Sequence, residues 1–178
     1  ALAALGANVT FITGPADAPR PSGVKVIEVQ TAQQMLDNVQ SALPADAAVF
    51  AAAVADWRVA NAADSKIKKD RSGVLPAMEF EENPDILRTV SQMTARRPTL
   101  VVGFAAETDD VVANAEAKRL RKGCDWIVAN DVSPETGIMG CTENAVTLIS
   151  EAGQETWDRM SKVDVARKLA NRIAEALA

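Results

Sequence analysis

The sequence predicts an α/β fold in which a mostly parallel sheet is doubly wound, with helices on both of its faces. Short apolar segments rich in β-branched residues alternate with segments of helical periodicity along most of the 178 residues, as in successive strand–helix–strand units. The apolar run 47–54 has no alternation, which is typical of a strand buried on both faces. A polar, basic stretch at about 57–80 interrupts the pattern and predicts a protruding arm.

Start and stop signals bound the predicted elements. Residues 1–6 are read as the end of a helix that stops at a glycine. Thr31 and Gln34 have the spacing of a capping box, and Asn83-Pro84-Asp85 is a strong helix start. A terminal hairpin is expected to turn at 151–153. Strands are predicted at residues 9–13, 24–29, 47–54, 77–80, 100–104, 126–129, 145–149 and 155–157, and helices at residues 31–43, 84–95, 109–122 and 162–178.

The composition fits one globular domain, residues 1–178, with 48% hydrophobic and 24% charged residues. No apolar run is both long enough and free enough of charge to span a bilayer, and the opening residues lack the basic region of a signal peptide. We therefore expect a cytoplasmic protein with no membrane partner. Cys124 and Cys141 form no metal-ligand pattern, and we expect both thiols to be reduced.

The sequence contains no His and no Tyr. This excludes Ser-His and Cys-His nucleophile pairs, His-ligated metals and the Tyr-Lys dyad of many nicotinamide-dependent reductases. Lys, Asp, Asn and backbone dipoles remain for catalysis. Such groups suit positioning and charge stabilisation, as in phosphoryl and nucleotidyl transfer.

The net charge of -5 argues against nucleic acid as a partner. The positive charge is nevertheless uneven, and two local basic patches on an acidic domain suit a small polyanion. Two solvated basic surfaces explain the same residues equally well. The patches are Lys66, Lys68, Lys69 and Arg71 on the arm, and Lys118, Arg119, Arg121 and Lys122 on a predicted helix.

Ligands of doubly wound sheets bind at the carboxyl ends of the strands. The alanines at 51–53 would let a ligand approach the backbone, and Asp56 would bind a sugar hydroxyl or a metal-bound phosphate. Close packing of the alanines and a turn cap at Asp56 form the alternative. Phe104 ends another predicted strand, where its ring could flank a base. Lys118 and Lys122 share a helix face by their i, i+4 spacing, as a plain surface would also allow.

The arm carries the densest positive charge. In an extended segment Lys66 and Lys68 point to one side and Lys69 to the other. Lysines on such an arm can close over a triphosphate and neutralise charge that develops during transfer, although a solvated charge run is the plain alternative. The helix start at 83–85 could receive an anionic group, but the tripeptide alone is a weak signal for binding.

Six segments together resemble the phosphopantothenoylcysteine synthetase (phosphopantothenate–cysteine ligase) domain of the bacterial bifunctional coenzyme A biosynthesis flavoprotein. They are AAAVADWRV, KIKK, ENPDIL, VVGFAAET, AKRLRKG and VANDVS, in the family's order and approximate spacing. The resemblance covers residues 1–178. It implies a Rossmann-like nucleotide-binding fold and a homodimer in which the arm reaches the partner's site.

The resemblance also implies the reaction. The family activates the carboxylate of 4′-phosphopantothenate with CTP as an acyl-cytidylate, releasing pyrophosphate. The amine of cysteine then displaces CMP, giving 4′-phosphopantothenoylcysteine for coenzyme A biosynthesis. Mg²⁺ is expected to accompany the triphosphate, with its protein ligands unassigned.

Site residues follow by position from the same resemblance. Lys66 is implied to be the catalytic lysine and to bind nucleotide. The other implied nucleotide-binding residues are Phe50, Ala51, Ala52, Asp56, Pro84, Asp85, Ile86, Leu87, Phe104, Lys118 and Lys122.

The chain departs from the family at its start. The family's first strand, its Gly-Gly-Thr turn and a loop Asn that handles the acyl-cytidylate are not in this sequence, so we read the domain as N-terminally truncated. The decarboxylase half of the parent polypeptide is absent too, and no FMN is expected. Two alternatives stay open: a nicotinamide-dependent Rossmann-type oxidoreductase, disfavoured by the missing Tyr and by the lysine arm, and a non-catalytic nucleotide-binding module.

Overall fold

The protein is a sheet flanked by helices on both sides. The computed structural model describes residues 1–61, 77–138 and 140–178. The main sheet has five strands in the order β3-β6-β7-β8-β9, and β1 and β2 form a separate parallel pair. The strands are β1 (Thr10–Thr13), β2 (Lys25–Glu28), β3 (Ala47–Phe50), β4 (Trp57–Val59), β5 (Phe80–Glu82), β6 (Leu100–Glu107), β7 (Trp126–Asp131), β8 (Glu143–Ser150) and β9 (Gly153–Ser161).

The centre of the main sheet is parallel and its far edge is antiparallel. β3 pairs with β6 and β6 with β7 in parallel, whereas the β8–β9 hairpin adds antiparallel strands to β7. This confirms the predicted α/β class, the mostly parallel central sheet and the terminal hairpin.

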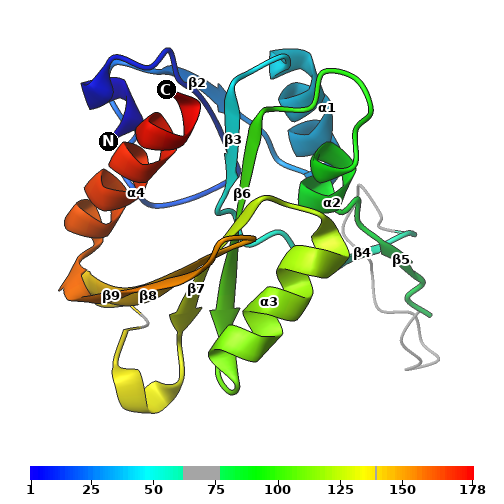
Figure 1. Ribbon diagram of the computed structural model, residues 1–178. Coiled ribbons are helices and arrows are strands. Elements are labelled where there is room, and N and C mark those ends of the chain that lie inside the picture. Colours follow the sequence, from blue (N-terminus) through cyan, green and yellow to red (C-terminus); the bar gives the residue numbers. More distant parts are fainter. Residues whose placement is uncertain (62–76, 139) are drawn as a thin grey trace.

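Helices cover both faces of this sheet (Figure 1). α1, α2 and α3 lie on one side and α4 lies on the other, close to the N-terminus. Two short 3-10 helices, η1 and η2, complete the described elements. The bounds are η1 (Leu2–Leu5), α1 (Ala32–Ala42), α2 (Ile86–Ser91), α3 (Val111–Lys122), η2 (Pro134–Thr136) and α4 (Lys162–Leu177).

Each face of the sheet has its own hydrophobic core. Alternate residues of one strand point to opposite faces, so Ile127 of β7 packs on the α3 side and Val128 packs on the α4 side. The α4 side also buries Trp157, which is 1% exposed. These two cores fix the strands that carry the candidate site.

Local signals placed several helix ends correctly. The Thr31 side chain accepts from the backbone N–H of Gln34, and the Gln34 side chain accepts from the backbone of Thr31, which is the predicted capping box. Gly6 is left-handed, with a φ of 88°, and closes η1. Both cysteines are free thiols, Cys124 buried and Cys141 exposed.

The predicted helix 84–95 is wrong at both ends. Helix α2 contains only Ile86–Ser91, and its N-cap is Asp85, whose side chain accepts from the backbone N–H of Arg88 at 3.0 Å. The predicted cap, Asn83, instead donates its side-chain amide to the carbonyl of Ala55 at 2.8 Å. A tertiary hydrogen bond has therefore taken the residue that the local pattern assigned to capping.

Three strand predictions need correction. The strand predicted at 77–80 is β5, which spans Phe80–Glu82. β3 ends at Phe50 rather than at 54, and it is not buried on both faces, since Val49 is 38% exposed. Its only partner within the described chain is β6, so one edge of β3 carries no strand. β6 continues to Glu107 rather than ending at Phe104, because its last three residues pair with β7.

The base of the predicted arm is a hairpin. β4 and β5 pair antiparallel, with Trp57 opposite Glu82 and Val59 opposite Phe80. The rings of Trp57 and Phe80 are 57% and 62% exposed. The whole basic cluster of the arm lies outside the described residues, and the proposed catalytic Lys66 lies there with it. None of the helices in the described ranges is long and apolar enough to cross a membrane.

Candidate functional site

The candidate site lies where β3 ends and its neighbour β6 continues. The last paired residues are Phe50 of β3 and Gly103 of β6, and β6 runs on for four further residues to Glu107. Beyond Phe50 the backbone leaves the sheet, and Ala51 and Ala52 are exposed. A strand that stops short of its parallel neighbour leaves backbone N–H and C=O groups of that neighbour available.

The loop after β3 is tied to the segment that leads into α2. The backbone N–H of Asn83 donates to the carbonyl of Asp56 at 2.8 Å, and the Asn83 side chain donates to the carbonyl of Ala55. The Asn83 side-chain oxygen also accepts from Arg58 of β4 at 3.2 Å. Asn83 thus joins the β3 loop, the base of the arm and the start of α2.

The start of α2 packs directly against the backbone of β6. A Cβ added at Gly103 would lie 2.7 Å from Cδ2 of Leu87, closer than side chains approach one another in proteins. Leu87 is part of the core on the α3 side. The absence of a side chain at Gly103 therefore lets the first turn of α2 sit on the sheet beside the end of β3.

Two lysines of α3 reach this same place. Lys118 Nζ donates to the carbonyl oxygen of Phe104 at 3.0 Å, one residue beyond the last β3–β6 pair. Lys122 Nζ forms a hydrogen-bonded ion pair with Oδ2 of Asp85, the N-cap of α2. The Lys122 side chain is only 19% exposed. Both lysines are therefore bonded to neighbouring elements, which a plain solvated surface would not require.

The rest of the α3 basic cluster behaves differently. Arg119 pairs with Glu116 on its own helix at 3.0 Å, and Arg121 is exposed. Arg119 therefore takes a partner on α3 itself, unlike the two lysines. Within this basic cluster, only Lys118 and Lys122 bond to α2 or β6.

Asp85 is the most strongly coordinated carboxylate of the candidate site. Burial raises the pKa of Asp85. The hydrogen bond from Lys122, the hydrogen bond from the backbone N–H of Arg88 and the charges of both residues lower this pKa by more than burial raises it. The net pKa of Asp85 lies below its ordinary value, so the group is ionised at neutral pH. Its negative charge is offset mainly by Lys122.

The structure brings together many of the residues predicted for nucleotide binding. Phe50, Asp85, Leu87, Lys118 and Lys122 meet around the end of β3, and Asp56 lies on the tied loop. The loop alanines and Pro84 flank them in sequence. This convergence unites three chain segments far apart in sequence.

Some predicted residues are placed differently from the expectation. The Phe104 side chain packs with the α4-side core, whereas Phe50 packs with the α3-side core, so the Phe104 ring does not lie on the face of the sheet that α3 covers. Ile86 is 6% exposed and contributes its side chain to the core. A ligand would meet Ile86 through its backbone.

Asn130 of β7 was not assigned a role from the sequence. It pairs with Ala106 of β6 near the carboxyl ends of both strands, and Asp131 next to it accepts from the backbone N–H of Ser133 at 2.8 Å. This hydrogen bond and one from the Ser133 side chain lower the pKa of Asp131. The position of Asn130 at the end of a parallel strand was the available signal, but the predicted strand stopped at 129.

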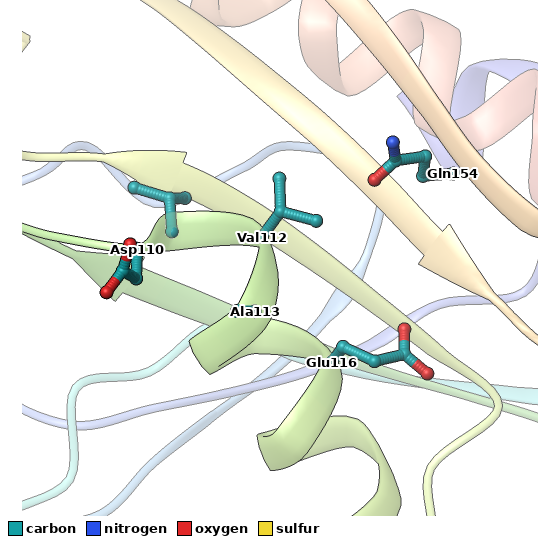
Figure 2. A pocket seen from close by; sticks show the side chains of 6 residues that line it. Asp110, Val112, Ala113, Glu116 and Gln154 are labelled. Carbon is teal, nitrogen blue, oxygen red and sulfur yellow. The ribbon is translucent and has the colours of Figure 1, made fainter.

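A surface pocket lies away from these residues, at the start of α3. It is lined by Asp110, Val111, Val112, Ala113 and Glu116, with Gln154 of β9 across from them (Figure 2). Its charged lining residues are both acidic. A site for a triphosphate would require the opposite charge, so this pocket does not compete with the candidate site.

Potential metal ligands are scattered in the described part of the chain. Within the described ranges, no group of three or more His, Cys, Asp or Glu residues is arranged to hold a metal ion. Mg²⁺ usually binds one or two carboxylates together with substrate phosphates rather than a full protein cage.

Comparison with known proteins decides the family. The family model described as the DNA/pantothenate metabolism flavoprotein C-terminal domain matches residues 1–177. The chain belongs to this family. The match covers every segment of the candidate site, including those on which the sequence resemblance was based.

Several curated relatives within the flavoprotein C-terminal domain family are bifunctional proteins of coenzyme A biosynthesis, named CoaBC. The chain is 40% identical to the Vibrio cholerae protein over 178 residues, 99% of this chain and 44% of that protein. It is 41% identical to the Haemophilus influenzae protein over 176 residues, 98% of this chain and 43% of that protein. The chain thus spans less than half the length of these relatives.

Solved structures agree with the family assignment. The C-terminal domain of a CoaBC protein superimposes with a TM-score of 0.77 at 30% identity, over 98% of this chain and 77% of that one. A Streptococcus pneumoniae DNA/pantothenate metabolism flavoprotein gives the same TM-score at 18% identity, over 98% of this chain and 84% of that one. The second match supports the fold, and both confirm the Rossmann-like architecture.

Proposed function

We propose that this domain ligates 4′-phosphopantothenate and cysteine in coenzyme A biosynthesis, using CTP. CTP would activate the substrate carboxylate as an acyl-cytidylate with release of pyrophosphate. The cysteine amine would then attack the acyl carbon, the C–O bond to CMP would break, and an amide would form. The family membership and the 40% identity to a coenzyme A biosynthesis protein support this proposal.

The single observation that carries the proposal is the meeting of α3 lysines, the α2 start and the end of β3. Lys118 and Lys122 bring two positive charges beside exposed backbone at the end of a parallel strand. A triphosphate needs positive charge, and a base or ribose can be read by backbone groups. No other described surface joins these features.

Each predicted residue then has a physical role. The backbone at Phe50, Ala51 and Ala52 would contact the base or ribose, as would that of Pro84, Ile86 and Leu87 at the start of α2. Lys118 and Lys122 would neutralise phosphate oxygens, and Lys66 would add charge as pyrophosphate leaves. The Phe104 side chain packs with the α4-side core, so Phe104 would contact the ligand through its backbone.

Mg²⁺ would accompany the triphosphate and neutralise part of its charge. Asp56 is an exposed carboxylate on the loop after β3 and fits one ligand position. The bound phosphates and water would supply the others.

We further propose a homodimer in which the arm contacts the partner subunit. The exposed rings of Trp57 and Phe80 and the exposed Met78 at the hairpin base support this proposal, because large apolar side chains gathered on a protrusion favour burial in an interface. β3 has one edge without a strand in the described chain. We propose that the strand and glycine-rich loop expected from the family complete the site on this side.

The decisive experiment uses the complete natural polypeptide. It is incubated with 4′-phosphopantothenate, cysteine and CTP, and pyrophosphate, CMP and the amide product are measured. Titration of ATP against CTP tests the nucleotide preference. Absence of all three products, together with reduction of a carbonyl compound by a nicotinamide, would replace the ligase with the oxidoreductase alternative.

The Lys66→Gln variant tests the arm. We expect turnover to fall by about 2–4 kcal/mol in activation free energy, the range for loss of one preorganised charge, with circular dichroism and melting temperature unchanged. Lys162→Gln at the start of α4 is the matched control and should retain the wild-type rate. Wild-type turnover in Lys66→Gln would remove this lysine from the mechanism.

A further inference from the structure

The two oxygens of Asp85 serve different partners. Oδ1 accepts from the backbone N–H of Arg88 and caps α2, while Oδ2 is paired with Lys122 of α3. Asp85 and Lys122 are 37 positions apart in sequence. One carboxylate therefore fixes the start of one helix and the lysine side chain of another.

The charge of Asp85 makes direct contact with a nucleotide phosphate unfavourable. Two anions a few ångströms apart repel unless a cation lies between them. In the structure the cation next to Asp85 is Lys122, whose side chain is more buried than that of its partner, at 19% against 37% exposed. Apart from its cap on α2, Asp85 would therefore act on an anionic ligand through this lysine.

Lysine is a flexible side chain that loses considerable rotamer entropy when it is fixed. Its ammonium has three donors, so a bond to Asp85 leaves two for another acceptor. Lys118, one turn earlier, is fixed in the same way by the carbonyl of Phe104. Two acceptors of the protein thus hold two neighbouring ammonium groups in place before a ligand arrives.

We infer that Asp85 is a positioning residue that holds Lys122 ready for the anionic substrate, and is not itself a nucleotide ligand. This inference rests on the proposed function, because it assigns a task to one member of the same site. It revises the role that the family resemblance implies for Asp85, which is direct nucleotide contact. It also separates Asp85 from Pro84 and Leu87, which offer backbone groups.

The test is a double-mutant cycle in the complete natural polypeptide, with CTP as the varied substrate. Asp85→Asn keeps a good N-cap oxygen for α2 but replaces Oδ2 with an NH2 group, which donates and cannot accept from the Lys122 ammonium. We expect the KM for CTP to rise about 5- to 20-fold, with kcat changed less than about threefold. In a Lys122→Met background, Asp85→Asn should raise KM by less than about twofold further.

Two controls separate positioning from folding. Asp85→Asn should melt close to the wild type, whereas Asp85→Ala, which also removes the cap, should melt lower but show a similar rise in KM. Glu155→Gln breaks another carboxylate–lysine pair, with Lys168 at 3.5 Å on the α4 side, and should leave the KM for CTP unchanged.

The possible results are distinguishable. Independent, multiplicative effects of Asp85→Asn and Lys122→Met on KM would show that Asp85 contacts the nucleotide or its metal directly and would overturn the inference. An unchanged or lowered KM in Asp85→Asn would also overturn it. If the wild-type protein forms no product with CTP, the proposed function itself fails, and the cycle is not reached.

Discussion

Two lysine–carboxylate pairs lie on opposite faces of the sheet and differ in their surroundings. On the α3 side, Lys122 pairs with Asp85 beside the end of β3. On the α4 side, Lys168 pairs with Glu155 and lies 4.7 Å from the centroid of the Trp157 ring, and Arg172 contacts the same carboxylate at 3.2 Å. Both pairs join a helix to another element.

Their surroundings make the difference. Trp157 is 1% exposed and packs with Val165 and Leu169 of α4, so the α4 pair covers a filled core. The α3 pair lies next to a strand that stops early and a loop with exposed alanines. The α4 pair thus covers a buried core, whereas the α3 pair lies beside exposed backbone. What distinguishes the two pairs is their position relative to the end of a strand.

The largest expected effect concerns the α4 side. Trp157→Ala removes a fully buried aromatic side chain, and we expect the free energy of unfolding to fall by about 3–5 kcal/mol in denaturant titrations. Trp57→Ala, at an exposed ring of the arm, is the control and should change it by less than about 0.5 kcal/mol. A loss below 1 kcal/mol for Trp157→Ala would mean that this face is not a filled core.

A smaller effect is expected where α2 meets β6. Gly103→Ala places a methyl group 2.7 Å from the Leu87 side chain, and such overpacking costs about 1–3 kcal/mol. Because Leu87 belongs to the first turn of α2, the KM for CTP should rise as well. The Gly103→Ala/Leu87→Ala double variant should be more stable than the sum of the single losses predicts. Strict additivity would show that the two residues do not touch.

The smallest effect is the pH dependence of the α3 pair. The folded-state pKa of Asp85 is lowered, so its contribution to stability is present above the unfolded pKa of about 3.9 and is lost as pH falls through the folded value. Because both partners are partly exposed, this contribution is at most about 1 kcal/mol. The stability difference between wild type and Asp85→Asn should therefore shrink between pH 5 and pH 3. A constant difference over that range would show that the pair contributes nothing to folding.

The sequence predicted the order of the elements well, because periodicity and capping are local. Thr31 and Gln34 formed their capping box as expected, and the hairpin turn fell at the predicted residues. Strand length was less predictable. Whether the run from Ala47 remains in the sheet depends on pairing with β6, which local composition does not encode.

The candidate site was predictable as a set of segments but not as contacts. The motifs at the ends of β3 and β6 pointed to one edge of the sheet. The pairing of Lys122 with Asp85 depends on how α2 and α3 pack, and the role of Asn83 depends on a carbonyl at position 55. No local rule relates residues so far apart in sequence. The packing of Leu87 on Gly103 places α2 on β6, and α3 contacts the same strand.

The two-stranded sheet of β1 and β2 has a dynamic consequence. Within the described chain these strands bond only to each other, whereas β6 and β7 are bonded on both sides. A pair of strands with few neighbours opens at a lower free energy than the centre of a larger sheet. Backbone amides of 10–13 and 25–28 should therefore exchange with deuterium sooner than those of β6 and β7, and fluctuations of this protein should begin at its amino-terminal side.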